Sequence, residues 1–406
     1  MVIRPVAFRL ILVLLGCVAS WWILKRAFPP YLWMAALWAA LSAFLFVTST
    51  GWRRVAWFNV GAVIVVLGAG EFFCWRTTPA GSLRTHGSAG AIESHEFLGN
   101  APRKGAVDSV SRYDDGVLSF HVSYSIDSLG WRVTPWHGES EEDAAPIAFF
   151  GCSLTFGEGV PDSATLPAQV NLQSKGRFRA RNFGFSGYGP HQMLAILEHR
   201  LEAPALPRRP IMAIYQAIPG HVYRTLGRTT WDPGPRYRLQ PDGTVRFAGR
   251  FHTPLASKAL NVLYRSFLLG RWMDIWNRRL GPRDYALYFG VVEAARREFQ
   301  ARYPGSDFAV IFWDTRTASP EALRMDELLL AGFARRGIRA VPVSRILPGY
   351  PREAQRYLLS RHDPHPNALA YRALAEYLIE QLLPAPPGRP ETDSSPPGPD
   401  APGSPR

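Results

Sequence analysis

Two stretches decide how this 406-residue chain is understood: Phe149–Gly159, with the sequence FFGCSLTFGEG, and His362–Asn367, with the sequence HDPHPN. In the first, a short apolar run ends in a glycine-rich turn that carries Ser153. In the second, Asp363 and His365 stand just before a helical pattern. A serine hydroxyl becomes a strong nucleophile when an imidazole takes its proton and a carboxylate fixes the imidazole tautomer. The two stretches can therefore supply Ser153, His365 and Asp363 to one catalytic site.

Strand-like and helical patterns alternate over residues 146–384. The apolar runs that we expect to be strands are Pro146–Phe150, Phe178–Phe183, Pro210–Ala217, Asp307–Trp313 and Gly337–Val343. Helical patterns include Pro190–Leu201 and the closing segment Asn367–Leu383, with Asn367 as its N-cap. This alternation predicts an α/β fold, a parallel sheet with helices on both faces. Ligands bind past the carboxyl ends of such strands, so we expect Ser153, Gly187 and residues 217–221 on one rim.

Three segments resemble sequence blocks of the SGNH/GDSL hydrolase family, in the family's order, within residues 145–384. They are Gly151–Gly159, Asn182–Gly189 and Asp363–Asn367. The resemblance implies a flavodoxin-like parallel sheet sandwiched by helices, and an ester hydrolase without cofactor or metal. It also implies a role for each matched group: Ser153 as nucleophile, His365 as general base, Asp363 as the carboxylate that orients it, and the amides of Ser153 and Gly187 as oxyanion donors.

The chain departs from the family pattern in three places. Cys152 stands where the family usually has aspartate, and we expect a buried filler there and not a nucleophile. The acid precedes His365 by two residues and not by the usual three. The block that carries an asparagine oxyanion donor is not visible, and the matching strand end reads AIYQAIPGH over residues 213–221. His221 is therefore a candidate for the third oxyanion donor, or for substrate recognition with Arg224, whereas Asn182 is expected to hold its turn.

Three apolar runs fill residues 1–76: Val6–Leu24, Tyr31–Val47 and Val55–Trp75. Each approaches the roughly 20 residues that a helix needs to cross a bilayer. The sequence therefore predicts three transmembrane helices and a multi-pass membrane protein. The basic residues at the two sides nearly balance, so the positive-inside rule does not set the orientation. By resemblance to envelope-modifying enzymes, we expect the catalytic domain on the extracytoplasmic side.

The remaining segments divide the chain further. Residues 77–100 are expected to be a linker and residues 101–145 a small β extension. Within the catalytic domain, 146–384, an insertion at 222–303 contains a hairpin around Asp242-Gly243 and amphipathic helices at 257–279 and 283–302. This insertion can form a lid or substrate wall, or it can pack on the sheet edge. The tail 385–406 is rich in proline, glycine and serine and is expected to be disordered.

Composition excludes several function classes. The net charge is +13, but the arginines are dispersed and no nucleic-acid motif appears, so a basic surface near anionic lipid is the expected reading. Three cysteines give no disulfide framework, and no cysteine-histidine spacing suggests zinc. We expect no cofactor, no metal and no nucleic-acid partner.

The sequence thus predicts a membrane-anchored serine acyl-ester hydrolase that acts on an acylated envelope glycan or lipid. An O-acyltransferase of the same fold would use the same groups with a sugar hydroxyl in place of water. A catalytically silent domain used for binding is the alternative from another class, and the missing asparagine block favours it. Acyl donor, acceptor and oligomeric state are left open.

Overall fold

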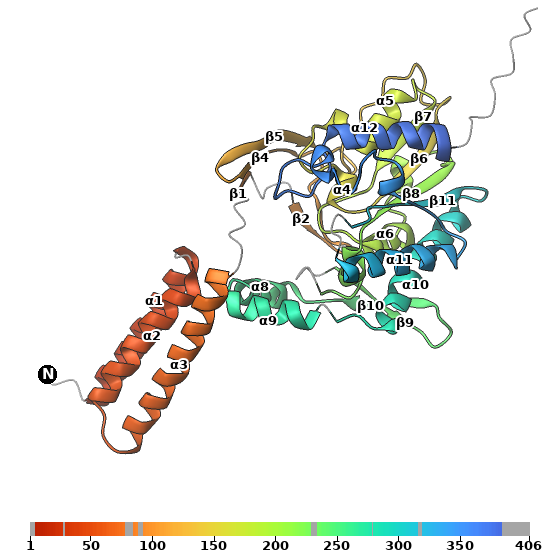
Figure 1. The fold of residues 1–406 in the computed structure, drawn as a ribbon. Coiled ribbons are helices and arrows are strands. Elements are labelled where there is room, and N and C mark those ends of the chain that lie inside the picture. Colours follow the sequence, from red (N-terminus) through yellow and green to blue (C-terminus); the bar gives the residue numbers. More distant parts are fainter. Residues whose placement is uncertain are drawn as a thin grey trace, which may run out of the picture.

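Three long helices project from an α/β domain, and a small group of strands lies against that domain (Figure 1). The structure is a computed structural model, and it describes residues 5–26, 29–77, 84–87, 92–228, 234–277, 279–315 and 319–383. The tail 385–406, for which the sequence predicts disorder, lies outside the described residues.

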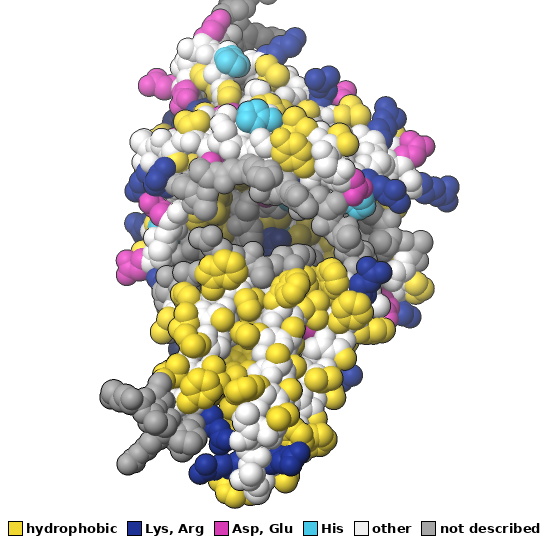
Figure 2. All heavy atoms as spheres, turned by 90° about the vertical axis from the view of Figure 1, so that its left-hand side faces the viewer, with side chains coloured by type: hydrophobic (Ala, Val, Ile, Leu, Met, Phe, Trp, Pro, Cys, Tyr) yellow, Lys and Arg dark blue, Asp and Glu magenta, His cyan; other side chains and the backbone are white. Residues whose placement is uncertain are grey.

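The projecting helices are α1 (Pro5–Arg26), α2 (Pro30–Val47) and α3 (Trp52–Thr77). All three are long and apolar enough to cross a membrane, which supports the prediction of a membrane protein. Apolar side chains cover their surface, and basic side chains gather at the end farthest from the α/β domain (Figure 2). Hydrocarbon can replace water along such a surface while the charges reach the head groups. The N-terminal helices thus have the composition of membrane-spanning helices. That all three cross a bilayer, and in which direction, stays a prediction.

The α/β domain is built on five parallel strands. They are β6 (Ala145–Phe150), β7 (Phe178–Asn182), β8 (Met212–Ala217), β11 (Asp307–Phe312) and β12 (Arg339–Pro342). Their order across the sheet is β7-β6-β8-β11-β12, which in chain order is 2-1-3-4-5. This is the flavodoxin-like order, whose switch point lies between the first and third strands. The predicted fold class is confirmed, and the switch point falls between β6 and β8.

Helices cover both faces of this sheet (Figure 1). Side chains alternate along each strand, so Ile147 and Phe149 enter one core while Ala148 and Phe150 enter the other. The first core lies under α5 (Leu166–Gln173) and α12 (Ala368–Tyr377). The second lies under α6 (Pro190–Glu198), α10 (Pro282–Arg302) and α11 (Pro320–Ala334). Two short helices, α4 (Ser153–Phe156) and α7 (Gly220–Thr225), follow β6 and β8 at the rim.

The small β region differs in detail from its prediction. β4 (Val107–Asp114) and β5 (Val117–Ser125) form an antiparallel hairpin around Asp115 and Gly116. The predicted linker 77–100 also contains β1 (Arg84–Gly87), which pairs with β4, and β2 (Ile92–His95), which pairs with β3 (Gly99–Pro102). These polar segments become strands because a neighbouring strand satisfies their backbone groups.

The insertion after α7 contains the predicted hairpin, β9 (Pro235–Leu239) and β10 (Val245–Arg250). The helix expected over 257–279 is two helices, α8 (Pro254–Leu263) and α9 (Phe267–Asn277). The helix is interrupted near Ser266, where Glu71 of α3 accepts hydrogen bonds from Ser266 and from the first N–H groups of α9. α8 and α9 lie beside the membrane-region helices, and not on the edge of the sheet (Figure 1).

Candidate active site

The turn after β6 places Ser153 at the switch point of the sheet. β6 ends at Phe150, and α4 begins at Ser153 itself. Between them, Gly151 has a φ of 150°. A Cβ atom there would lie 2.2 Å from Thr155 Oγ1 and 2.9 Å from the Gln216 carbonyl oxygen, so the close packing requires glycine. The tight turn leaves Ser153 almost buried, with 6% of the residue exposed.

The three predicted catalytic side chains form one hydrogen-bonded series. His365 Nε2 lies 2.9 Å from Ser153 Oγ, and His365 Nδ1 lies 2.6 Å from Asp363 Oδ1. Asp363 Oδ1 also accepts a hydrogen bond from the His365 backbone N–H at 3.1 Å. A carboxylate at Nδ1 holds the proton there, which leaves Nε2 to accept the serine proton. The fold therefore joins groups that lie 212 residues apart in the chain.

Asn367 fixes the C-terminal end of the loop that carries Asp363 and His365. Asn367, two residues after His365, caps α12 because its Oδ1 accepts from the Ala370 N–H at 3.1 Å, which confirms the predicted N-cap. Its Nδ2 donates back to the carbonyl oxygens of Arg356 and Leu358 at 2.9 and 3.1 Å. One side chain therefore fixes both the helix and the preceding loop, and with them the position of the imidazole.

Arg112 of β4 reaches the triad from the small β region. Its guanidinium donates to Asp363 Oδ2 at 2.7 Å and to Glu158 Oε1 at 2.5 Å. Burial alone would raise the pKa of Asp363, but the hydrogen bonds and charge of His365 and the hydrogen bond from Arg112 outweigh it. Together they lower that pKa from 3.8 to about 2. Asp363 is therefore a carboxylate at neutral pH although its side chain has no exposed surface.

Glu158 brings a second carboxylate to the nucleophile. Its Oε2 lies 3.7 Å from His365 Nε2 and accepts a hydrogen bond from Ser186 Oγ at 2.8 Å. The nitrogen that faces Ser153 thus also faces a negative charge. Glu158 lies within the first stretch quoted from the sequence, but nothing in that pattern indicates that it turns toward the histidine.

Arg132 holds the turn that carries Glu158. The arginine side chain is fully buried and donates to the carbonyl oxygens of Phe156 at 3.1 Å and Val160 at 2.9 Å. Its Nε also donates to Asp162 Oδ1 at 2.7 Å. A planar guanidinium can bond several acceptors at once, which suits it to a fixed turn. Arg112 and Arg132 are functional candidates that sequence reasoning missed, because only the fold brings them to residues 153–162.

The predicted oxyanion donors lie on adjacent loops. Ser153 is the first residue of α4, so its N–H has no acceptor within the helix. Gly187 has a φ of 85°, and a Cβ atom there would meet nothing within 4 Å. Neither amide has a backbone acceptor within the part of the chain that the structure describes. Both N–H groups are thus available to a developing oxyanion.

His221 is placed differently from its prediction. The residue is fully buried, and its Nδ1 lies 2.5 Å from the Tyr215 hydroxyl, with the two rings stacked. Burial and the charge of Arg224 lower its pKa well below the usual value, so the ring is neutral. A side chain without exposed surface cannot reach a substrate at the rim. The prediction of His221 as an oxyanion donor is therefore not supported by this geometry.

Two other predictions concern packing. Cys152 is fully buried, as expected for a small filler. Asn182 holds its turn: its Nδ2 donates to the Thr155 carbonyl oxygen at 2.8 Å, and its Oδ1 accepts from the Gly184 N–H at 3.0 Å. Among the described residues, neither side chain forms a hydrogen bond with the Ser153 hydroxyl. Both stabilise the loops around it.

One group of side chains among the described residues has the spacing of a metal site: Asp114, Asp115 and His362. Asp114 Oδ1 lies 2.6 Å from His362 Nδ1. Hydrogen bonds from Ser360 and His362 lower the pKa of Asp114 from 3.8 to about 2. These contacts fasten the β4–β5 turn to the loop before Asp363, which gives the group a structural role without an ion.

Comparisons with known proteins find similarity at the level of structure. No family model matches the sequence, and no curated protein matches it. A member of the lipolytic protein G-D-S-L family from Veillonella parvula is 15% identical over 59% of this chain and 98% of that chain, with a TM-score of 0.34. A GDSL-like lipase from Bacteroides thetaiotaomicron is 12% identical over 61% and 89%, with a TM-score of 0.32. A catalytic mutant of an acetylxylan esterase from Geobacillus stearothermophilus is 13% identical over 61% and 95%, with a TM-score of 0.33.

Proposed function

We propose that this chain is a serine acyl-ester hydrolase of the SGNH/GDSL type, anchored by its N-terminal helices, whose substrate is an acylated envelope glycan or lipid. The observation that carries the proposal is the unbroken series from Ser153 Oγ to His365 Nε2 at 2.9 Å and from His365 Nδ1 to Asp363 Oδ1 at 2.6 Å. A silent binding domain has no need of a buried carboxylate that is kept ionised behind a histidine.

The mechanism follows from this geometry. Ser153 Oγ attacks the ester carbonyl while His365 Nε2 takes its proton, and Asp363 stabilises the resulting imidazolium. The N–H groups of Ser153 and Gly187 bind the oxyanion. His365 then protonates the leaving alcohol, which leaves an acyl group on Ser153. In the second half, His365 takes a proton from water, and the same steps in reverse release the acid.

Glu158 favours a neutral substrate at the scissile bond. Its carboxylate lies 3.7 Å from His365 Nε2, where it supports the positive charge that develops on the imidazole. The same charge repels an anionic group at that position, so a carboxylic ester is favoured over a phosphoester. A sugar hydroxyl in place of water as the acyl acceptor would make the enzyme an O-acyltransferase. The ratio of free acid to new ester, formed in the presence of a glycan, distinguishes the hydrolase from the transferase.

The test is labelling of the full-length protein with a fluorophosphonate probe, which reacts quickly only with an activated serine. We expect stoichiometric labelling at Ser153, and loss of short-ester hydrolysis by at least about 10³-fold in Ser153→Ala and His365→Ala. Ser163→Ala, a change at an exposed serine ten residues away, is the matched control and should behave as wild type. Unlabelled but folded wild-type protein would remove the hydrolase proposal.

A further inference from the structure

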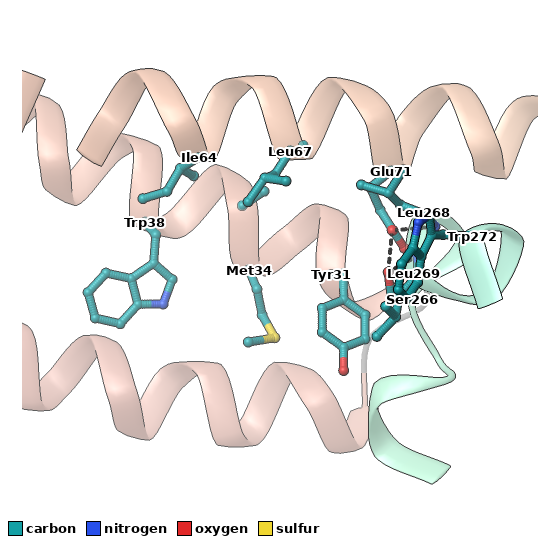
Figure 3. Close-up of a pocket in the computed structure, with 12 residues that line it drawn as sticks. Tyr31, Met34, Trp38, Ile64, Leu67, Glu71, Ser266, Leu268, Leu269 and Trp272 are labelled. Atoms are coloured by element: carbon teal, nitrogen blue, oxygen red, sulfur yellow. Dashed lines mark hydrogen bonds between the residues drawn. The ribbon is translucent and has the colours of Figure 1, made fainter. Parts of the chain in front are cut away.

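A cavity of about 620 Å³ opens between α2, α3 and α9, far along the chain from Ser153 (Figure 3). Its walls are almost wholly apolar. The side chains that shape it are Met34 and Trp38 of α2, Ile64 and Leu67 of α3, and Leu269 and Trp272 of α9. The volume lies in the range of small-molecule sites. Two of the three walls are helices long and apolar enough to span a membrane, so the cavity faces the region that hydrocarbon would fill.

The polar groups of this cavity lie at one end. Glu71 is 3% exposed and accepts hydrogen bonds from Ser266 Oγ at 2.7 Å and from the N–H groups of Phe267 and Leu268 at 2.8 and 2.9 Å. Tyr31 Oη donates to the Val262 carbonyl oxygen at 2.8 Å. An ionisable residue in a membrane-spanning helix is costly and marks function, with its partner as the guide. Here the partner is the start of α9, so Glu71 fixes the outer wall of the cavity.

The cavity has a direction relative to the bilayer. Tyr31 and Glu71 lie near the ends of α2 and α3 that face the α/β domain, and Trp38 and Ile64 lie seven residues farther along each helix. Seven residues of helix correspond to about 10 Å, roughly a third of a 30 Å hydrocarbon core. The polar end therefore lies near the membrane surface and the apolar end lies within the hydrocarbon, which is the polarity of a lipid molecule.

We propose that this cavity is a binding site for one acyl chain of a bilayer phospholipid. The ester end of the chain lies toward Tyr31 and Ser266, and its hydrocarbon lies between Trp38, Leu67 and Leu269. Water is a poor occupant because apolar walls offer it no hydrogen-bond partners. A lipid chain fills the space without a polar penalty and is supplied by the surrounding bilayer. The site is separate from Ser153 and does not depend on the hydrolase proposal.

The test uses the full-length protein in phosphatidylcholine–phosphatidylglycerol vesicles that contain a small fraction of phospholipid with a diazirine in its acyl chain. After irradiation, labelled positions are mapped by peptide mass spectrometry. We expect labelling that saturates with probe fraction at the cavity side chains of α2, α3 and α9. Outward residues such as Val66, which is 69% exposed, should be labelled in proportion to the probe, without saturation. Equal and unsaturable labelling at both places would overturn the proposal.

Variants sharpen the result. Met34→Trp and Leu269→Trp fill the cavity and should reduce labelling of α9 to the level of the outward residues. Val66→Trp, an equally large change on the outer face of α3, should leave it unchanged. Thermal unfolding of each variant in detergent checks that it is folded, and the saturation test on the wild type stands even if a variant fails. Cross-linked dimers in place of lipid adducts would assign the cavity to a second copy and would also overturn the proposal.

Discussion

Arg112 brings three parts of the chain together around the buried carboxylate of Asp363. It comes from β4, while Asp363 lies in the loop before α12 and Glu158 lies in the turn after α4. Because the Asp363 side chain has no exposed surface, protein groups alone must compensate its charge. Arg112 touches none of the atoms that react, so it is a positioning residue: it keeps the orienting acid ionised and in place.

Arg112→Ala should lower the free energy of unfolding by about 1.5–3 kcal/mol at neutral pH, since it removes a charged hydrogen bond from a buried carboxylate that then keeps its bonds to His365. The loss should depend on pH. The folded-state pKa of Asp363 is about 2, below its usual 3.8, so its stabilising effect is present above 3.8 and is lost as the pH falls toward 2. The difference in stability between wild type and variant should therefore shrink over that interval, as measured by denaturant unfolding in detergent.

Two further variants separate this role from a general loss of charge. Arg112→Lys keeps the charge without the two-pronged geometry and should restore part of the stability and of the turnover. Arg103→Ala removes an exposed arginine from the same small β region and should change neither. A stability difference for Arg112→Ala that stays constant from neutral pH down to pH 2 would argue against the Asp363 pair as its cause.

His221→Ala should affect stability and not the chemical step. The variant leaves the buried Tyr215 hydroxyl without its partner, which costs about 1–3 kcal/mol, and adds the cost of a cavity. Turnover per folded molecule should stay within a few fold of wild type, whereas removal of a true oxyanion donor typically costs about 10²–10³-fold. Turnover normalised to fluorophosphonate-reactive protein makes the comparison, and a loss of the larger size would return His221 to the site.

Ser153, Asp363, His365, Arg112 and His221 show which kinds of residue a sequence can reveal. Ser153, Asp363 and His365 are predictable because turn geometry and local spacing leave a pattern in the neighbouring residues, and the structure places them in hydrogen-bond contact. Arg112 leaves no such pattern, because its role depends on how the β4–β5 hairpin packs on a distant loop. The position of His221 after β8 suggests the rim, whereas the structure buries its side chain within α7.

At the scale of the element, the loop between η5 (Ala354–Tyr357) and α12 carries His365, the proposed catalytic base. Asn367→Ala should lower the free energy of unfolding by about 1–2 kcal/mol through the lost N-cap. It should also lower turnover, because the loop that carries His365 loses its bonds to Arg356 and Leu358.

Asn367→Asp is the matched variant for this prediction. The aspartate can still cap α12 with its oxygen, but it cannot donate to the two carbonyl groups. The carboxylate oxygen in place of Nδ2 would face both carbonyl oxygens, so we expect the cap to be kept but both stability and turnover to be reduced. Denaturant unfolding and ester hydrolysis, measured on the same samples, check the two effects. Equal turnover in Asn367→Asp and wild type would show that the loop is held by its other contacts.

Elements were predictable in proportion to their apolar content. The central strands β6, β8 and β11 are buried on both faces, so each reads as an apolar run. The edge strands β7 and β12 contain arginine and are partly buried, and all five strands lie within two residues of their expected limits. β1, β2 and β4 are short or polar strands that exist because they pair with a neighbour, and a single sequence carries little trace of such pairing. The break between α8 and α9 depends on Glu71, which lies 195 residues away from Ser266.

At the scale of the whole molecule, α8 and α9 lie between the α/β domain and the apolar helices α1–α3. Leu268 of α9 packs against Gly70 of α3, where an added Cβ atom would lie 3.3 Å from the leucine side chain. Leu255, Trp272 and Ile275 on the same two helices are exposed at 78%, 61% and 59%. Because these side chains are apolar and exposed on helices that lie beside α1–α3, we expect the insertion to serve as a second point of attachment to a bilayer.

A fragment that begins at residue 79, and so lacks α1–α3, should therefore still bind phospholipid vesicles. Removal of α3 uncovers Leu268 and adds it to the exposed apolar side chains of α8 and α9. Leu255→Ser with Trp272→Ser should weaken vesicle binding about a hundredfold, if each side chain contributes at least about 1.5 kcal/mol of burial in the interface. Leu323→Ser with Leu328→Ser alters exposed leucines on α11 and should leave binding unchanged. Sedimentation with vesicles measures the bound fraction, and fluorophosphonate labelling shows that the domain is folded. A folded fragment that stays in the supernatant at high lipid would leave α1–α3 as the sole attachment.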